Sequence, residues 1–186
     1  MSDLDGAKSK RPAPTEMVCT SRGQYVDTIA RTLYLLLSLR DFPCQDVERR
    51  SKPEIEFGLC TELLLAPKII GMKDMQEICL VEPSINSTRI SFQFRRGDDL
   101  EYSLANTFHR FLGMKADHLH LLRRTPVASY DVSFLVTSEL LHQHGPMSII
   151  LSLVKFAEDV PYFLRCLKED VLTRQRQNFE TYFSSQ

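Results

Sequence analysis

The chain has 186 residues, enough for about one domain with a single hydrophobic core. Its 43% hydrophobic and 25% charged residues are typical of a globular protein rather than of a disordered or collagen-like one. Basic and acidic side chains almost cancel, at a net charge of −1, which argues against a nucleic-acid binder driven by bulk charge.

The N-terminal two dozen residues lack the apolar centre of a secretory signal. The longest apolar stretch, residues 29–39, is interrupted by polar residues and is too short to span a membrane. The five cysteines are scattered and include no C-x-x-C pair, which argues against a disulfide framework and against a zinc ribbon. We therefore expect an intracellular chain in a reducing cytosol, without membrane insertion.

Residues 1–23 contain serine, lysine, aspartate and proline with almost no apolar periodicity, which predicts a flexible N-terminal arm. From Gln24 onward apolar residues recur at helical spacing until Pro43 ends the pattern, which predicts an amphipathic helix. The members of this stripe are Tyr25, Ile29, Leu33, Leu36 and Leu37.

Residues 52–95 carry short apolar runs separated by proline and glycine, a pattern typical of strands. The clearest strand is residues 89–95, where strict alternation places Ile90, Phe92 and Phe94 on a core-facing side. Residues 63–71 and 76–82 are predicted to be its companions, joined by a turn at residues 71–74.

A second helix is predicted to begin at Gly97, since Asp98 and Asp99 favour the positive end of a helix dipole. Its apolar stripe, which should lie on the sheet, contains Leu100, Leu104, Phe108, Phe111 and Leu112. Two further strands are predicted at residues 118–123 and 130–136. In the second of them Tyr130, Val132, Phe134 and Val136 share a face.

The C-terminal residues carry an apolar repeat with spacings of 4, 3, 4, 3 and 4, as in the seam of a coiled coil. Its members are Ile149, Leu153, Phe156, Val160, Phe163 and Leu167. Such a seam requires another helix, so we predict that it is a subunit interface. Pro161 lies within the repeat and lacks a backbone donor, so we expect a kink there or a break with a new helix.

Candidate chemical sites are weak. Two histidine pairs, His118 with His120 and His142 with His144, are interpreted as solvent-facing residues because no third ligand accompanies them. No motif for a nucleophile, a phosphate-binding loop or a metalloprotease is present, so we expect no catalytic residue, no cofactor and no metal. The basic clusters are suited to binding carboxylates or, more simply, to a solvated surface. They are Arg49–Arg50, Arg95–Arg96, Arg123–Arg124 and Arg174 with Arg176.

The chain resembles the family of subunit 4, the twenty-kilodalton subunit, of the actin-related protein 2/3 complex over residues 25–183. In its first half the resemblance rests on Val47-Glu48-Arg49, Lys52-Pro53-Glu54-Ile55-Glu56, Glu62-Leu63-Leu64-Leu65-x-Pro67 and Ser84-Ile85-Asn86-Ser87-x-Arg89-Ile90-Ser91. In its second half it rests on Phe108-x-Arg110-Phe111 and on Leu122-Arg123-Arg124-x-Pro126-Val127-x-x-Tyr130-Asp131-Val132-Ser133-Phe134-Leu135.

The resemblance implies an α+β fold: an antiparallel sheet with a helix packed on it, an N-terminal helix and a long C-terminal helix. The α+β domain would span residues 24–145, and residues 146–186 would form a helical segment that pairs with a partner subunit.

The resemblance also implies a function. The chain would be a non-enzymatic, cytoplasmic scaffold and actin-binding subunit of the branch-nucleating complex. Its helix would pair in a heterodimer with the thirty-four-kilodalton subunit, the larger scaffold subunit of the complex, alongside the other subunits, including the actin-related proteins. The loop after Arg123 and Arg124 would face the side of the mother filament. A stand-alone sheet-based module that binds RNA or protein remains the alternative.

Overall fold

The computed structural model describes residues 13–19, 21–38, 53–57, 65–72, 77–94, 110, 114, 119 and 121–184. Its strands are β1 (Thr15–Cys19), β2 (Lys68–Met72), β3 (Glu77–Pro83), β4 (Ser87–Phe94), β5 (Leu122–Arg124) and β6 (Val132–Thr137). Its helices are α1 (Arg22–Ser38), α2 (Glu54–Phe57), α5 (Ser138–His144) and α6 (Pro146–Ser184).

Within these residues the strands form one six-stranded sheet in the order β1-β2-β3-β4-β6-β5. Every neighbouring pair is antiparallel except β1 and β2, which run parallel. The α+β prediction is therefore confirmed, with one parallel pair at an edge of the sheet.

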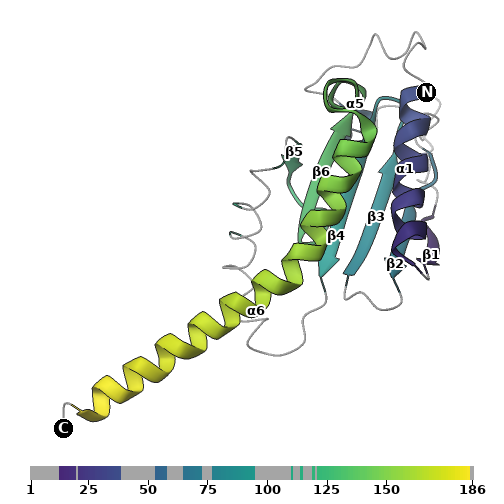
Figure 1. The fold of residues 1–186 in the computed structure, drawn as a ribbon. Coiled ribbons are helices and arrows are strands. Elements are labelled where there is room, and N and C mark those ends of the chain that lie inside the picture. The colour runs from purple at the N-terminus through teal and green to yellow at the C-terminus, as the bar shows by residue number, and fades with distance from the viewer. Residues whose placement is uncertain are drawn as a thin grey trace, which may run out of the picture.

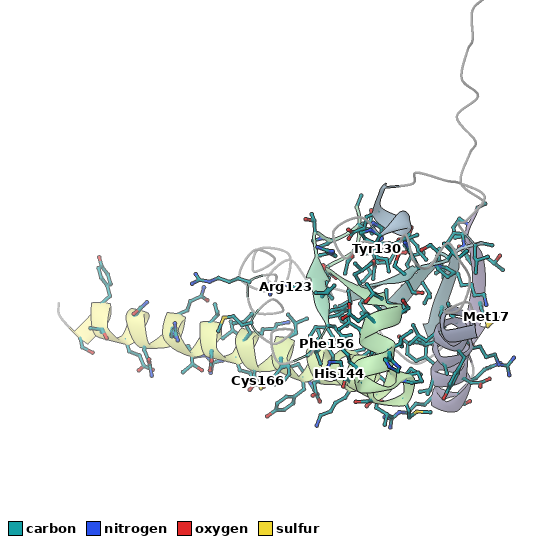
Figure 2. The ribbon with its side chains drawn as sticks, turned by 90° about the horizontal axis from the view of Figure 1, so that it is seen from above. Met17, Arg123, Tyr130, His144, Phe156 and Cys166 are labelled. Carbon is teal, nitrogen blue, oxygen red and sulfur yellow. The ribbon has the colours of Figure 1, made fainter. Side chains whose placement is uncertain are left out.

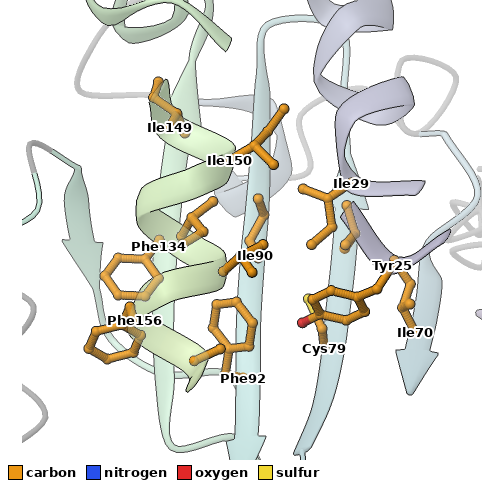
Figure 3. Close-up of a cluster of buried hydrophobic side chains, with 14 of the residues drawn as sticks. Tyr25, Ile29, Ile70, Cys79, Ile90, Phe92, Phe134, Ile149, Ile150 and Phe156 are labelled. Atoms are coloured by element: carbon orange, nitrogen blue, oxygen red, sulfur yellow. The ribbon is translucent and has the colours of Figure 1, made fainter. Parts of the chain in front are cut away.

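Helix α1 and the first half of α6 lie side by side across one face of the sheet (Figure 1). Between them and the strands lies the main core, in which side chains from both helices meet those of β2, β3, β4 and β6 (Figure 3). The predicted alternation of β4 is confirmed, since Ile90, Phe92 and Phe94 all belong to this core. Burial of such apolar surface is the main stabilising term for the domain.

The opposite face of the sheet carries α2. Leu135, next to core residue Phe134 on β6, points to this opposite face because side chains alternate along a strand. There it packs against Ile55 of α2 in a separate small cluster. The sheet is thus covered by helix on both faces, although α2 is only 4 residues long.

Helix α1 confirms the first predicted helix. Tyr25, Ile29 and Leu33 are buried, while the side chains of Leu36 and Leu37 lie outside the described residues. The Ser21 hydroxyl accepts a hydrogen bond from the Gln24 amide at 3.3 Å, satisfying one of the donors that a helix start leaves without an intrahelical acceptor. The cap explains why the helix begins at Arg22.

The predicted flexible arm is wrong for residues 15–19, which form β1, and for Arg22 and Gly23, which belong to α1. Residues 1–12 lie outside the described residues. Among the predicted strands, the structure has β2 at 68–72 instead of 63–71, and β5 at 122–124 instead of 118–123. The other two predictions, 76–82 and 130–136, are within one or two residues of β3 and β6.

The predicted helix that begins at Gly97 lies largely outside the described residues. Only Arg110 and Met114 are described in that stretch, and both are helical. The turn at 71–74 is described only through Met72. Helix α5 is not among the predicted elements; it is capped by the Thr137 hydroxyl, which accepts a hydrogen bond from the Leu140 amide.

Helix α6 follows α5 through Gly145, whose φ of 76° lies in the region that favours glycine. It then begins at Pro146, a position where the missing proline N–H costs nothing. It continues for 39 residues, so of the two alternatives predicted at Pro161, a kink or a break, the break is wrong. Figure 1 shows that the helix axis changes direction about where α6 leaves the sheet, which agrees with the alternative of a kink caused by a proline within the helix.

Candidate functional site

Four of the six predicted seam residues pack inside the chain itself. Ile149, Leu153, Phe156 and Val160 are at most 6% exposed and belong to the core beneath α6. Phe156 contacts rings from both β4 and β6 (Figure 3). These four side chains are not available to a partner, which corrects the predicted subunit interface at these positions. The spacing predicts a helix–helix seam, but at these four positions the sheet packs against α6 in place of a second helix.

The other two seam residues lie where α6 leaves the sheet. Leu167 is half-buried and packs against the edge of the core, and half-buried Phe163 contacts Tyr162 with ring centroids 5.8 Å apart. Leu164 is the last buried residue along the described part of α6. Beyond it the helix continues to Ser184, a further length of roughly 30 Å at about 1.5 Å per residue.

We call residues 165–184 of α6 the projecting segment; Figures 1 and 2 show it extending away from the sheet. It carries half-buried Val171, and it exposes Leu172 and Tyr182, the latter by 61%. Most of the stability of a helix in a protein comes from packing of one face, and this segment packs little of its surface against the described part of the chain. Within the described residues the segment therefore has few contacts with the rest of the chain.

Arg123 and Arg124 lie on β5, at the edge of the sheet toward which the projecting segment extends (Figure 2). In the strand register Arg123 is opposite Phe134 and Arg124 is opposite Ser133, so the two side chains point to opposite faces. The two guanidinium groups therefore do not form one binding surface on the same face of the sheet.

The two arginines differ in their surroundings. Arg123 is exposed. Arg124 is half-buried, and its Nε lies 3.1 Å from Oε1 of Glu56 on α2 without the alignment of a hydrogen bond. The ion pair links the β5 edge to α2. The sequence does not indicate Glu56 as a partner, because α2 is only one turn long and carries no helical pattern.

The loop after Arg124 is anchored to the sheet. The Val127 amide donates to the Ser133 hydroxyl at 3.1 Å, and the Tyr130 amide donates to the Val127 carbonyl at 3.0 Å. Ser129 takes a positive φ of 73° in the turn between them. Burial raises the pKa of the Tyr130 hydroxyl, with smaller contributions from nearby Cys79 and Glu82. The loop is thus held close to the sheet rather than free in solvent.

Other predicted candidates form no chemical site within the described residues. His142 and His144 are exposed at the end of α5, while His118 and His120 lie outside the described residues. No group of three or more metal-ligating side chains occurs in the parts of the chain that the structure describes. Arg174 and Arg176 are exposed on the projecting segment, and the pairs at 49–50 and 95–96 are not described. None of the described helices has the length and hydropathy needed to cross a membrane.

Comparison with known proteins gives a consistent result. The model of the family described as "ARP2/3 complex 20 kDa subunit (ARPC4)" matches residues 18–185. The match begins inside β1, so the first three residues of that strand precede the shared region.

Three curated relatives resemble the chain over most of its length. "Probable actin-related protein 2/3 complex subunit 4" of Caenorhabditis elegans is 34% identical, covering 85% of this chain and 93% of the relative. "Actin-related protein 2/3 complex subunit 4" of Dictyostelium discoideum is 37% identical, covering 84% and 92%. The protein of the same name from Saccharomyces cerevisiae is 33% identical, covering 85% and 92%.

Proposed function

Because the chain belongs to the ARP2/3 complex 20 kDa subunit family, we propose that it is a scaffold subunit of the actin-related protein 2/3 complex, which nucleates branched actin filaments. In this role it works by binding other proteins and needs neither a catalytic residue nor a cofactor. Its partners are the other subunits, including the actin-related proteins, and it acts in the cytoplasm with the actin cytoskeleton.

The projecting segment of α6 is the proposed binding site for the larger scaffold subunit of the complex. The observation that supports this most is that the helix continues for roughly 30 Å beyond Leu164, its last buried residue among those described. Its polar residues are interspersed with Val171 and Leu172, which suits a partner helix lying along it. Phe163 and Leu167 remain in this proposed interface, at the point where α6 leaves the sheet.

The β5 edge is the proposed contact with the side of the mother filament. Arg123 is exposed there and suits the carboxylates of a filament surface, with which a guanidinium group forms short charge-assisted hydrogen bonds. Arg124 supports the contact, because its ion pair with Glu56 and the anchored loop limit the movement of the strand. A contact on a pre-ordered loop costs less conformational entropy on binding.

Purification of the tagged chain from its own cells, followed by mass spectrometry, tests complex membership. We expect the larger scaffold subunit and the actin-related proteins to co-purify in equal amounts with the chain. Recovery of the chain alone as a folded monomer would contradict the proposal and would favour a stand-alone binding module.

A further inference from the structure

Strand β1 is attached to the sheet mainly through its main chain and through one buried side chain, Cys19. It pairs with β2 in parallel register from Thr15 with Lys68 to Cys19 with Met72, and the Thr15 amide donates to the Pro67 carbonyl at 2.9 Å. Of its five side chains only Cys19 is buried, while Val18 is 67% exposed. The Thr28 hydroxyl of α1 donates weakly to the Met17 sulfur at 3.7 Å, and Thr28 also interacts with the Cys19 side chain.

The pairing joins residues far apart in the chain, Thr15 with Lys68 at one end and Cys19 with Met72 at the other. No hairpin turn joins β1 to β2, because α1 follows β1 directly, so β1 can leave the edge without opening a turn. Parallel pairs are slightly less stable per residue than antiparallel ones. Elements with few buried contacts open at low free energy while the rest of a domain stays folded.

Strand β2, whose outer edge pairs with β1, is held in the sheet without β1. Strand β2 is paired on its other side with β3 in antiparallel register, and Ile70 is fully buried in the main core. Departure of β1 would therefore expose a row of main-chain donors and acceptors on an otherwise intact strand. Such an edge accepts an extended peptide by strand addition, in which main-chain hydrogen bonds give affinity and alternate side chains give specificity.

We propose that the outer edge of β2, residues 68–72, is a strand-addition site for an extended peptide, which β1 occupies as a detachable strand of the same chain. The peptide that fits has the chemistry of β1: a small apolar side chain at the Cys19 position, an unbranched apolar one at the Met17 position and a free choice at Val18. Since β1 begins before the region shared with the family, the proposal does not rest on the proposed function.

Peptide binding tests the proposal. A chain lacking residues 1–19 is purified in the same assembly as the intact chain and is titrated against a fluorescent peptide of residues 13–19, followed by anisotropy. We expect saturable binding at least tenfold tighter than to the intact chain. A Cys19→Asp peptide should lose this binding, whereas the matched Val18→Asp peptide should retain it.

Three results would overturn the proposal: no saturable binding, equal loss with both substituted peptides, or failure of the truncated chain to fold. Hydrogen exchange on the full-length chain provides a second test that needs no truncation. With Cys19→Asp, protection should fall at residues 15–19 and 68–72 and stay unchanged in β4 and β6; loss of protection throughout the sheet would contradict detachability. The Val18→Asp chain is the matched control, and its protection should stay unchanged throughout.

Discussion

Phe156 on α6 meets Phe134 on β6 edge to face, with ring centroids 5.3 Å apart and an interplanar angle of 87°. Phe92 of β4 and Phe94 of β4 also contact the Phe156 ring, at centroid distances of 6.4 and 6.5 Å. One residue of the helix thus joins α6 to two strands. The aromatic cluster fixes where the buried half of α6 lies and therefore the direction from which the projecting segment starts.

Replacing Phe156 with alanine should lower the free energy of unfolding by about 3–5 kcal/mol, because it removes buried apolar area and leaves a cavity among three rings. Leu151, on the same helix but 53% exposed, provides the control, and Leu151→Ala should cost no more than about 0.5 kcal/mol. Urea unfolding measures both. Equal effects of the two changes would contradict the burial of α6 on the sheet.

The ion pair between Arg89 and Glu82 lies on the face of the sheet opposite α6. Their atoms Nε and Oε2 are 2.7 Å apart, and the side chains are 15% and 11% exposed. Arg89→Met removes the cation from a buried carboxylate and should cost about 3–5 kcal/mol. The double variant Arg89→Met with Glu82→Leu should recover most of this loss in a thermal melt. A double variant as unstable as the single one would show that the pair is not the cause.

The stability of the chain should decrease with rising pH as Tyr130 ionises. Its pKa is raised above the ordinary 10.0 by burial, so the folded state holds the phenol proton more tightly than the unfolded chain. Its contribution is complete below pH 10 and is lost as the pH rises through the folded-state pKa. Tyr130→Phe should therefore lose less stability than the parent as the pH rises above 10.0 and through the folded-state pKa, and the two should differ by a constant amount at lower pH. Parallel curves throughout would contradict the burial of this hydroxyl.

Separate charge reversals distinguish the roles of the two arginines on β5. Arg123→Glu should leave the complex intact and weaken its co-sedimentation with filaments by tenfold or more, because like charges then meet at the contact. Arg124→Glu should instead loosen the β5 edge, since it places a carboxylate beside Glu56.

Adding Glu56→Arg to Arg124→Glu restores an opposite-charge pair and should restore stability. Normal filament binding by the Arg123→Glu complex would exclude that residue from the contact. If the same complex falls apart, the arginine is structural.

Much of the helical layer and of the sheet centre could be predicted from the sequence. In α1 and β4 the spacing of the apolar residues is the spacing at which side chains repeat on one face of a helix or strand. The residues with this spacing, Tyr25, Ile29 and Leu33 of α1 and Ile90 and Phe92 of β4, all belong to the main core. β1 could not be found in this way, because an edge strand with one buried side chain, Cys19, leaves no alternating pattern.

The repeat in α6 was ambiguous for a different reason. Spacings of 3 and 4 bring residues to one face of a helix, whether that face meets a helix or a sheet. From Ile149 to Val160 the sheet is the partner, and spacing alone does not contain that information. Likewise, the link between Arg124 and Glu56 depends on the tertiary position of α2, which no local pattern in so short a helix encodes.

The most direct test of the account is the pairing of the projecting segment with the larger scaffold subunit, measured by light scattering on the co-produced chains. We expect a 1:1 heterodimer with the full-length chain and no heterodimer with a chain that ends at Lys168, which keeps the buried half of α6. Val171→Asp should weaken the pairing at least tenfold, whereas the exposed matched control Thr173→Asp should not. A stable heterodimer formed by the shortened chain would contradict the account.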